Sequence, residues 1–467
     1  MRTNDSIFNR YGRELRELFL LAGPILGAQL ATTGMTFIDT SMAGQYSPVD
    51  LAAIALGSSI WMPLSLLIRG VLIATTPTVA QLYGAQKLDQ IAAPVRQGLW
   101  VALGLSLLAV VALNNTGVVY DWLQVEPEVS ARSVEYLKAL SWGVPAVCLY
   151  QVMSSYSEGM SKTKPAMVFG FLALMLNIPV NYVLIYGKFG FPELGGVGCG
   201  YATAISFWLM LLLMSLSVKF ADIHRRVGVF NEFSLPDFNR IKNLLKLGVP
   251  IGLSIFFEAS IFSAVALVIG KLGAITVAGH QIALNFTALT FVVPLSMSIG
   301  VTIRVGQALG SGKPEQAAFT GFSGIATTLL TAACSASIML LFPEKVAAIY
   351  TKDPAVSILA AELLFFAALF QFADGVQVAS NGALRGYKDS RVPMVLILIA
   401  CWGIALPFGY TLGMTDYITE PMGPHGLWIG LVTAMTLCAV MLITRLRIIS
   451  RRYQKHEEFK TSEAVSA

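Results

Sequence analysis

The chain has 467 residues, of which 55% are hydrophobic and only 13% are charged. The charged share is about half of that in soluble domains, and a soluble fold of this composition would expose large apolar patches. Intrinsic disorder is excluded because disordered chains are polar and charged, and five cysteines are too few for a disulfide-based secreted scaffold. The composition predicts a polytopic membrane protein, and the net charge of +5 gives no reason to expect a nucleic-acid partner.

Twelve apolar stretches are each long enough to cross the hydrocarbon core as a helix, which takes about 20 residues. In the first half they lie near residues 18–42, 52–80, 97–116, 133–157, 166–187 and 197–219. In the second half they lie near residues 246–270, 277–305, 318–342, 357–382, 393–414 and 425–446. Strands of a membrane barrel would instead alternate over about ten residues. The predicted fold class is therefore an all-α polytopic membrane protein with twelve transmembrane helices.

Lysine and arginine residues gather at both ends of the chain and in one set of loops. The N-terminal segment carries Arg2, Arg10, Arg13 and Arg16, and the C-terminal tail carries Arg445, Arg447, Arg451, Arg452, Lys455 and Lys460. Loops after the even-numbered spans are also basic, among them the loop with Arg385, Lys388 and Arg391. Because these residues concentrate on the cytoplasmic side and an even number of spans puts both ends on one side, both termini are predicted to be cytoplasmic.

The two halves of the chain align with an offset of about 226–228 residues. Residues 21–25 match residues 247–251, and the same order continues where Gly159 matches Gly386. Each half contains six spans, so the halves enter the membrane in the same direction as a parallel repeat, with the substrate site between them. The repeat predicts a six-helix N-terminal lobe over 1–220, a cytoplasmic linker over 221–245, a six-helix C-terminal lobe over 246–450 and a cytoplasmic tail over 451–467.

Three acidic residues lie inside the predicted spans, namely Glu258, Asp374 and Asp39. A carboxylate in hydrocarbon costs several kcal/mol, so each is a candidate functional residue. The repeat places Thr32, Val147 and Val265 at the equivalent positions, so the fold itself does not require an acid there. The alternative is a neutral, hydrogen-bonded acid that fixes helix packing, and for Asp39 also solvation at the membrane interface.

The three acids inside the predicted spans indicate a role in cation exchange. One carboxylate can bind a proton, a metal cation or an organic cation, but not all of them together. Competition for a single site would couple the flux of one cation to the flux of another without a covalent step.

A polar group is predicted beside Asp39. Asn177 and Asn181 flank Pro179 in the fifth span and share a helix face because they are four residues apart. Together with Thr203 they form a candidate polar site, although asparagine can also serve as a packing contact between membrane helices.

Arg69 and His280 also lie inside the predicted spans, and both receive structural interpretations. For Arg69 we expect a structural role or a side chain that reaches toward the cytoplasmic interface. For His280 we expect a hydrogen-bonded residue at the start of a helix.

Sequence signals for chemistry or ATP hydrolysis are missing. The segment GSGKP at 310–314 lacks the first glycine of a P-loop and the Ser or Thr after its lysine. No metal cluster and no nucleophile arrangement is visible in the sequence. We therefore expect a secondary transporter and not an enzyme.

Several ordered motifs resemble the multidrug and toxic compound extrusion (MATE) family, in its NorM-type branch. They are KPAM at 164–167, LNIP at 176–179, GGVGCG at 195–200, GHQIALNF at 279–286, PLS at 294–296, IRVG at 303–306 and LRGYKD at 384–389. The resemblance extends from about residue 18 to residue 446 and includes both halves.

The resemblance implies two six-helix lobes around a V-shaped cavity and a multidrug efflux antiporter. It would export cationic, amphipathic drugs and dyes in exchange for Na⁺ or H⁺ by alternating access. The protein would work without a cofactor, as a monomer in the lipid bilayer of a bacterial inner membrane. The runner-up is a flippase for a lipid-linked or polysaccharide precursor, which would be expected to have more basic residues in its cavity.

The resemblance also implies roles for individual residues. Glu258 and Asp374 match the cation-site acids of the C-terminal lobe, where Na⁺ would bind. Asp39, Asn177 and Asn181 match the polar site of the N-terminal lobe. Phe370 stands where the family pattern has a tyrosine, so a hydroxyl is lost while an aromatic face for a cation remains.

Overall fold

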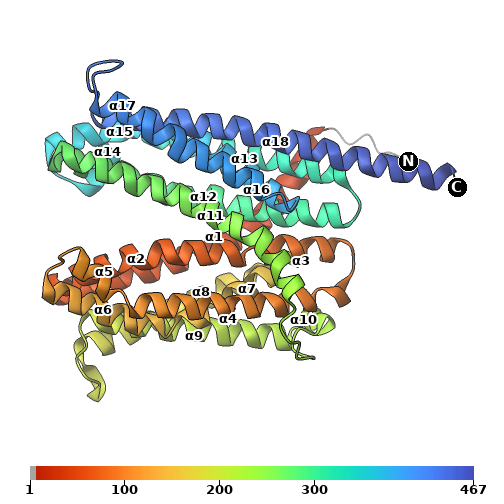
Figure 1. Ribbon diagram of the computed structural model, residues 1–467, viewed down its shortest axis with the longest axis horizontal. Helices are drawn as coiled ribbons and strands as arrows, with labels where there is room; N and C mark the ends of the chain where they lie inside the picture. The colour runs from red at the N-terminus through yellow and green to blue at the C-terminus, as the bar shows by residue number, and fades with distance from the viewer. Residues whose placement is uncertain (1–6, 467) are drawn as a thin grey trace. The chain divides into compact units, whose positions relative to one another are not determined.

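The computed structural model describes residues 7–466, with side chains described through Glu457, and all of its regular elements are helices (Figure 1). In the first half these are α1 (Ile7–Tyr46), α2 (Pro48–Leu72), α3 (Thr75–Gly84), α4 (Ala92–Asn114), α5 (Gly117–Trp122), α6 (Pro127–Ser141), α7 (Val144–Gly159), α8 (Lys164–Tyr186), α9 (Gly196–Phe220) and α10 (Asp222–Val227). In the second half they are α11 (Phe238–Ile269), α12 (Ala274–Gly310), α13 (Pro314–Leu341), α14 (Pro343–Tyr350), α15 (Pro354–Gly386), α16 (Arg391–Leu398), α17 (Leu406–Met414) and α18 (Pro424–Ser466). Short turns of helix η1 (Leu88–Gln90), η2 (Lys188–Gly190), η3 (Gly270–Leu272) and η4 (Ile399–Ala405) join them.

Eleven helical segments among the described residues are long and apolar enough to cross a membrane. The remaining predicted span, 133–157, is divided between α6 and α7, each of which is shorter than a full crossing. The break falls at Trp142 and Gly143, where Pro145 follows in the first turn of α7 and fixes a new helix start. Gly143 allows close packing, because a Cβ there would lie 2.6 Å from the Cα of Ala204.

Prolines inside the long helices mark places where the backbone ladder loses a bond. Pro24 lies inside α1 and Pro250 lies inside α11, at matching positions of the repeat. In the span over 391–414 the backbone also has to accommodate a proline, Pro407. Here a π-helical stretch, η4, ends shortly before it. The wider turn removes the need for the proline nitrogen to bond within an ordinary helical turn.

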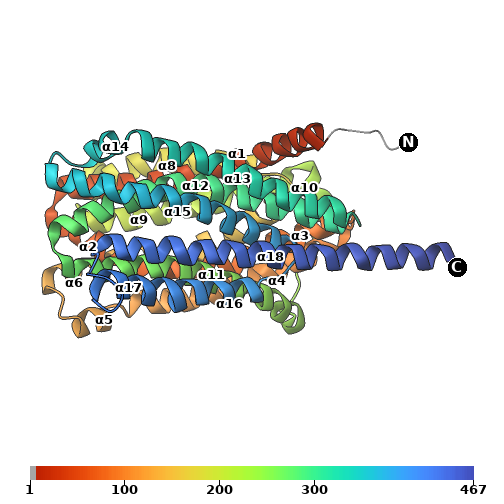
Figure 2. The ribbon, with the colours of Figure 1, turned by 90° about the horizontal axis from the view of Figure 1, so that it is seen from above.

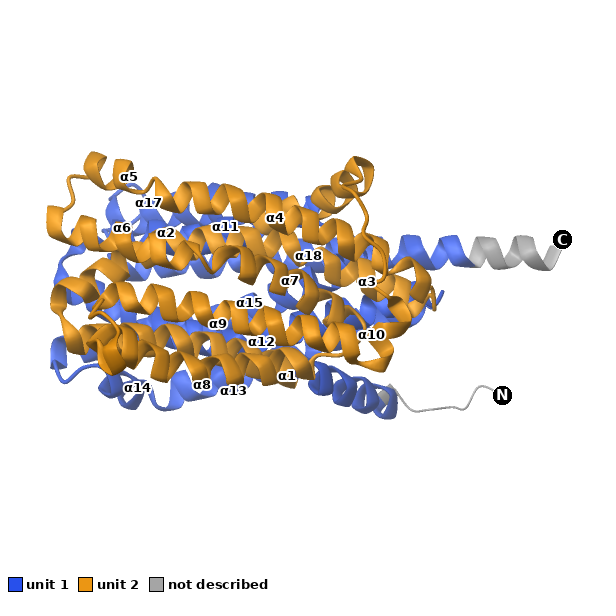
Figure 3. Cartoon of the chain, turned by 90° about the horizontal axis from the view of Figure 1, so that it is seen from below, with its two compact units in different colours: residues 1–22, 253–467 blue, residues 23–252 orange. Residues whose placement is uncertain are grey.

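The chain forms two compact units (Figure 3). Unit 1 contains residues 1–22 and 253–467, and unit 2 contains residues 23–252. The first and seventh predicted spans therefore each change unit part-way along a continuous helix, next to Pro24 and Pro250. The lobe ends at 220, 246 and 450 remain predictions, and the described part of the predicted tail, residues 451–466, continues the helix of α18.

Unit 1 is built around α15, which packs against α12, α13 and α18. Its core is apolar and includes Leu363, Phe370, Trp428 and Leu442. The start of α1 and the end of α18 lie at the same end of this unit, as Figure 2 shows. This arrangement agrees with an even number of crossings between the two termini.

Unit 2 is held together mainly by α2, α4, α6, α7, α8 and α9. The glycine-rich start of α9 lies directly on its neighbours: a Cβ at Gly198 would lie 2.8 Å from the carbonyl carbon of Leu184 in α8. A Cβ at Gly200 would lie 2.7 Å from the carbonyl oxygen of Tyr136 in α6. These close approaches fix the rotation of α9 and thereby the direction of the polar side chain one turn later, Thr203.

Candidate cation sites

The first site lies in unit 2 and centres on Asp39 of α1. Asn181 of α8 donates from Nδ2 to Oδ1 of Asp39 at 2.6 Å, and Thr203 of α9 donates to the other carboxylate oxygen, Oδ2, also at 2.6 Å. Asn181 donates as well to Oδ1 of Asn177, one turn earlier on α8, at 2.9 Å. The structure thus brings all four predicted residues of this polar site together.

The burial of Asp39 decides whether it could be an acid solvated at the membrane interface. The residue is 6% exposed in the protein, and both asparagines are fully buried, so solvation at an interface does not account for it. Two polar atoms of the site, Nδ2 of Asn177 and Oδ1 of Asn181, have no partner among the described residues. The free amide oxygen is an acceptor that a bound cation or water can use.

The second site lies in unit 1 and contains two acids, Glu258 of α11 and Asp374 of α15. Nε2 of Gln377, three residues after Asp374, donates to Oε2 of Glu258 at 3.2 Å. Asp374 is 2% exposed and feels the charge of Glu258 directly. Two carboxylates at such a site repel each other when both are ionised, so a proton or a metal cation is needed between them.

The donor set of this acid pair suits a hard cation. Two carboxylates and the unpartnered amide oxygen Oε1 of Gln377 supply oxygen ligands, which Na⁺ shares with other hard cations. Within the described ranges there is no cluster of three or more His, Cys, Asp or Glu residues that would hold a transition metal. The same oxygens can equally hold a proton, so the ligand set alone does not choose between Na⁺ and H⁺.

Phe370 lies one turn before Asp374 and is buried in an aromatic cluster. Its ring centroid is 5.8 Å from that of Phe262 and 6.4 Å from that of Trp428. Nε1 of Trp428 in turn donates to Nδ1 of His280 at 3.2 Å. Phe370 therefore packs edge-on in the wall behind the acid pair, and its predicted role as an aromatic face for a cation stays a prediction.

Two of the sequence interpretations change in detail. His280 is hydrogen-bonded as expected, but it is not at a helix start, because α12 begins at Ala274 and His280 is fully buried inside it. Arg69 has partners that the sequence did not name. Its Nε donates to Oε1 of Gln151 in α7 and its Nη2 donates to Oε1 of Gln29 in α1, each at 3.3 Å. These contacts join three helices of unit 2 and support a structural role.

Several buried charged residues were not singled out from the sequence, among them Glu158, Arg385 and Glu14. Glu158, at the end of α7, accepts a hydrogen bond from Ser154 at 2.8 Å. Arg385, predicted to lie in a cytoplasmic loop, is buried in the last turn of α15. Glu14, in the first turns of α1, forms a two-pronged ion pair with Arg304 at 3.0 and 2.6 Å.

The signal for these three residues was weak because each lies near a predicted loop, where charge is ordinary. Their burial follows from helices that extend beyond the apolar core of the predicted spans.

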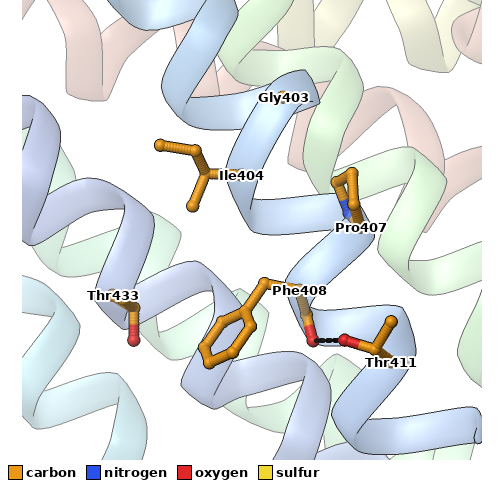
Figure 4. Close-up of a pocket in the computed structure, with 6 residues that line it drawn as sticks. All are labelled: Gly403, Ile404, Pro407, Phe408, Thr411 and Thr433. Atoms are coloured by element: carbon orange, nitrogen blue, oxygen red, sulfur yellow. Dashed lines mark hydrogen bonds between the residues drawn. The ribbon is translucent and has the colours of Figure 1, made fainter. Parts of the chain in front are cut away.

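A groove in unit 1 has a volume of about 440 Å³ and contains none of the predicted site residues in its lining (Figure 4). It is lined by Gly403, Ile404, Pro407, Phe408, Thr411 and Thr433. The Oγ1 of Thr411 is turned to its own helix, where it donates to the carbonyl oxygen of Phe408 at 2.8 Å. Without a charged group in its wall, this groove offers nothing to select a cation.

Comparison with known proteins gives a consistent result over the whole chain. The profile of the MatE family matches twice, at residues 24–183 and 250–411, which reproduces the offset of the internal repeat. The multidrug resistance protein PmpM of Pseudomonas aeruginosa is 49% identical over 98% of this chain and 96% of its own length. The multidrug resistance protein MdtK of Yersinia pseudotuberculosis serotype O:1b is 45% identical over 95% of this chain and 97% of its own.

Solved structures show the same fold at lower sequence identity. A crystal structure of a MATE protein in complex with MaD3S superposes with a TM-score of 0.85 at 21% identity, over 95% of this chain and 97% of that one. The eukaryotic MATE transporter AtDTX14 superposes with a TM-score of 0.83 at 19% identity, over 96% of this chain and 99% of that one.

Proposed function

Because the chain belongs to the multidrug and toxic compound extrusion (MATE) family, we propose that it is a multidrug efflux antiporter that exchanges cationic, amphipathic drugs for Na⁺ or H⁺. The full-length likeness to proteins named for multidrug resistance supports drugs as the substrate class. Transport by a member of this family is not an enzymatic reaction. We further propose a monomer in a bacterial inner membrane, with both termini in the cytoplasm.

The acid pair of unit 1 is the observation that carries this proposal. Glu258, which is half-buried, and Asp374, which is buried, bring two carboxylates into one site, where full ionisation is costly unless a cation is shared between them. A cationic drug or a coupling cation that binds here neutralises part of the negative charge of the acid pair. Binding of one cation therefore disfavours the other, and this competition couples the two fluxes.

Asp39 is proposed as a second, separate acidic site. Its carboxylate already receives two short hydrogen bonds, which stabilise the ionised form and keep the side chain in place. We propose that this negative charge attracts a cationic drug. The free amide oxygen of Asn181 beside it adds a further acceptor.

The test is dye transport in proteoliposomes that contain the purified protein. Efflux of a fluorescent cationic dye such as ethidium is measured with an imposed sodium gradient alone and, in parallel, with an imposed proton gradient alone. We expect one of the two ion gradients to drive the dye against the concentration gradient of the dye. The ion whose gradient does so is the coupling ion. Movement under neither gradient, with lipid-linked precursor translocated instead, would replace the antiporter by the flippase.

A further inference from the structure

Helix α15 continues the acid pair of unit 1 with a row of buried polar side chains. Gln377, Asn381 and Arg385 follow Asp374 at spacings of three and four residues, so all four share one helix face. We call Gln377, Asn381 and Arg385 the α15 polar column. All three are buried, and the row from Asp374 to Arg385 extends over about 16 Å along the helix.

The column has too few hydrogen-bond partners. Among the described residues, Oε1 of Gln377 and Nε of Arg385 are buried without a partner, and so are Oγ of Ser380 and Oη of Tyr387 beside them. Buried polar atoms in folded proteins are nearly always paired, with ordered water where protein groups do not reach. Two of these atoms belong to the column and two to residues next to it along the chain, so together they indicate water along this part of α15.

The repeat supplies a comparison within the same molecule. In α7 of unit 2, Glu158 stands at the position that Arg385 occupies in α15. There the polar side chains satisfy one another: Ser154 donates to Glu158 at 2.8 Å, and Gln151 donates to Ser155 at 3.2 Å. The unpaired atoms of α15 are thus not a requirement of the shared fold.

The neighbouring face of α15 is packed without space for water. A Cβ at Gly382 would lie 2.5 Å from the carbonyl oxygen of Ser298 in α12, and one at Gly386 would lie 3.1 Å from that of Thr302. Thr302 also donates to the carbonyl oxygen of Gly382 at 2.7 Å. Glycine thus brings α12 against one side of α15, and the polar column lies on another side.

The two ends of the column have different neighbours. At the inner end, Gln377 donates to Glu258, and the charge of Arg385 also attracts that carboxylate. At the outer end, the ring of Tyr387 is 5.3 Å from that of Tyr453 in the last part of α18. The column therefore runs from the acid pair to the end of unit 1 that carries the end of α18.

We propose that the α15 polar column lines a water-filled path through which the acid pair exchanges its cation with solvent at the α18 end of unit 1, the side predicted to be cytoplasmic. The assignment of the cation as a coupling ion rests on the proposed function, whereas the presence of water does not. Arg385 places a fixed positive charge at the outer part of the path. This charge also acts on Glu258, so it offsets part of the negative charge of the acid pair when the metal cation or proton leaves.

The first test is thiol accessibility in a variant without the five native cysteines. Ser380→Cys and Asn381→Cys are treated with methanethiosulfonate ethylammonium in lipid nanodiscs, and labelling is followed by mass spectrometry. The reagent reacts with thiols that water reaches, so we expect both to be labelled at least tenfold faster than Ala379→Cys. The control is matched, because Ser380 and Ala379 are adjacent and both fully buried.

Equal, slow labelling at all three positions would contradict the path. If the cysteine variants do not fold, hydroxyl-radical footprinting of the unmodified protein gives the answer instead. Water beside Tyr387 predicts rapid oxidation of its buried ring, while Tyr156, which is fully buried and has its hydroxyl 3.0 Å from Nδ1 of His224, serves as the protected control. Protection of both tyrosines to the same degree would likewise contradict the proposal.

A transport arm then separates the path from the function. Labelled Asn381→Cys is expected to bind the dye and to lose at least tenfold in gradient-driven dye transport, because the added group blocks cation exchange. Rapid labelling of a protein that transports no dye before modification leaves the water path standing and overturns the antiporter. Rapid labelling that leaves transport unchanged overturns the role of the path in cation exchange.

Discussion

The two acidic sites of this protein solve the same electrostatic problem in different ways. In unit 2 a single carboxylate, Asp39, receives two hydrogen bonds of 2.6 Å, from Asn181 and Thr203. In unit 1 the site of Glu258 and Asp374 has two carboxylates, and among the described residues its amide donor, Gln377, bonds only Glu258, at 3.2 Å. A carboxylate with both oxygens bonded can remain ionised in the protein, whereas a pair with one donor is stable only with a proton or a cation.

An acid inside a membrane protein can therefore serve either as a fixed charge or as an exchange site. The number of donors around it decides which. Breaking each site should therefore change the stability of the protein in different directions.

The largest effect is expected from the acid pair. Glu258→Gln and Asp374→Asn each remove the charge that binds the coupling cation, so gradient-driven dye transport should fall at least about tenfold in proteoliposomes. Stability at neutral pH should stay the same or rise, because the repulsion between the carboxylates is gone. Glu362→Gln is the matched control and should transport normally, because Glu362 lies on α15 like Asp374 but is exposed beside His425. Retained transport in both acid-pair variants would remove the basis for cation exchange at this site.

A smaller effect, measured on stability, is expected at the Asp39 site. Asp39→Ala leaves the donors of Asn181 and Thr203 buried without an acceptor, which should lower the free energy of unfolding by about 1–3 kcal/mol. Asp39→Asn should recover most of this loss, since its amide can pair with both neighbours. Chemical denaturation in detergent micelles, followed by tryptophan fluorescence, measures the difference. Equal stability of the alanine variant and the parent protein would show that the two sites do not differ in this way.

The smallest effect concerns the pH dependence of stability, which we expect to arise at His224 in unit 2 and not at either acidic site. Burial, with a contribution from the charge of Lys162, lowers the pKa of His224 from 6.5 to about 4. The unfolded imidazole therefore takes up a proton first, so stability is fully present above pH 6.5 and decreases as the pH falls from 6.5 to 4. His224→Gln should flatten the denaturation free energy over this range. If the variant keeps the slope of the parent protein, the response belongs to another group.

Much of the architecture followed from composition and periodicity. Long apolar stretches have few alternatives in a bilayer, because every backbone polar group must be paired within a helix. Among the described residues the twelve spans appear as eleven long helical segments and the broken pair α6 and α7. The break was not predicted, because Trp142 and Gly143 interrupt the helix without interrupting the hydropathy.

The candidate sites were predicted in part. Polar residues in apolar spans stand out in a sequence, and this identified Asp39, Glu258 and Asp374. The burial of Glu14, Glu158 and Arg385 was missed, because a charged residue near the end of a span reads as part of a loop. Only the packing of neighbouring helices shows that such a residue is enclosed.

By itself the sequence determined the membrane-spanning helical class, the internal repeat, and the identity of the acids that neither topology nor repetition requires. These properties depend on the order and polarity of residues along one chain. The tertiary structure decided the number of donors at each acid, the change of unit beside Pro24 and Pro250, and the unpaired polar atoms of α15. Those properties depend on which side chains from distant segments meet, and the pairing of buried polar groups is settled only where helices pack.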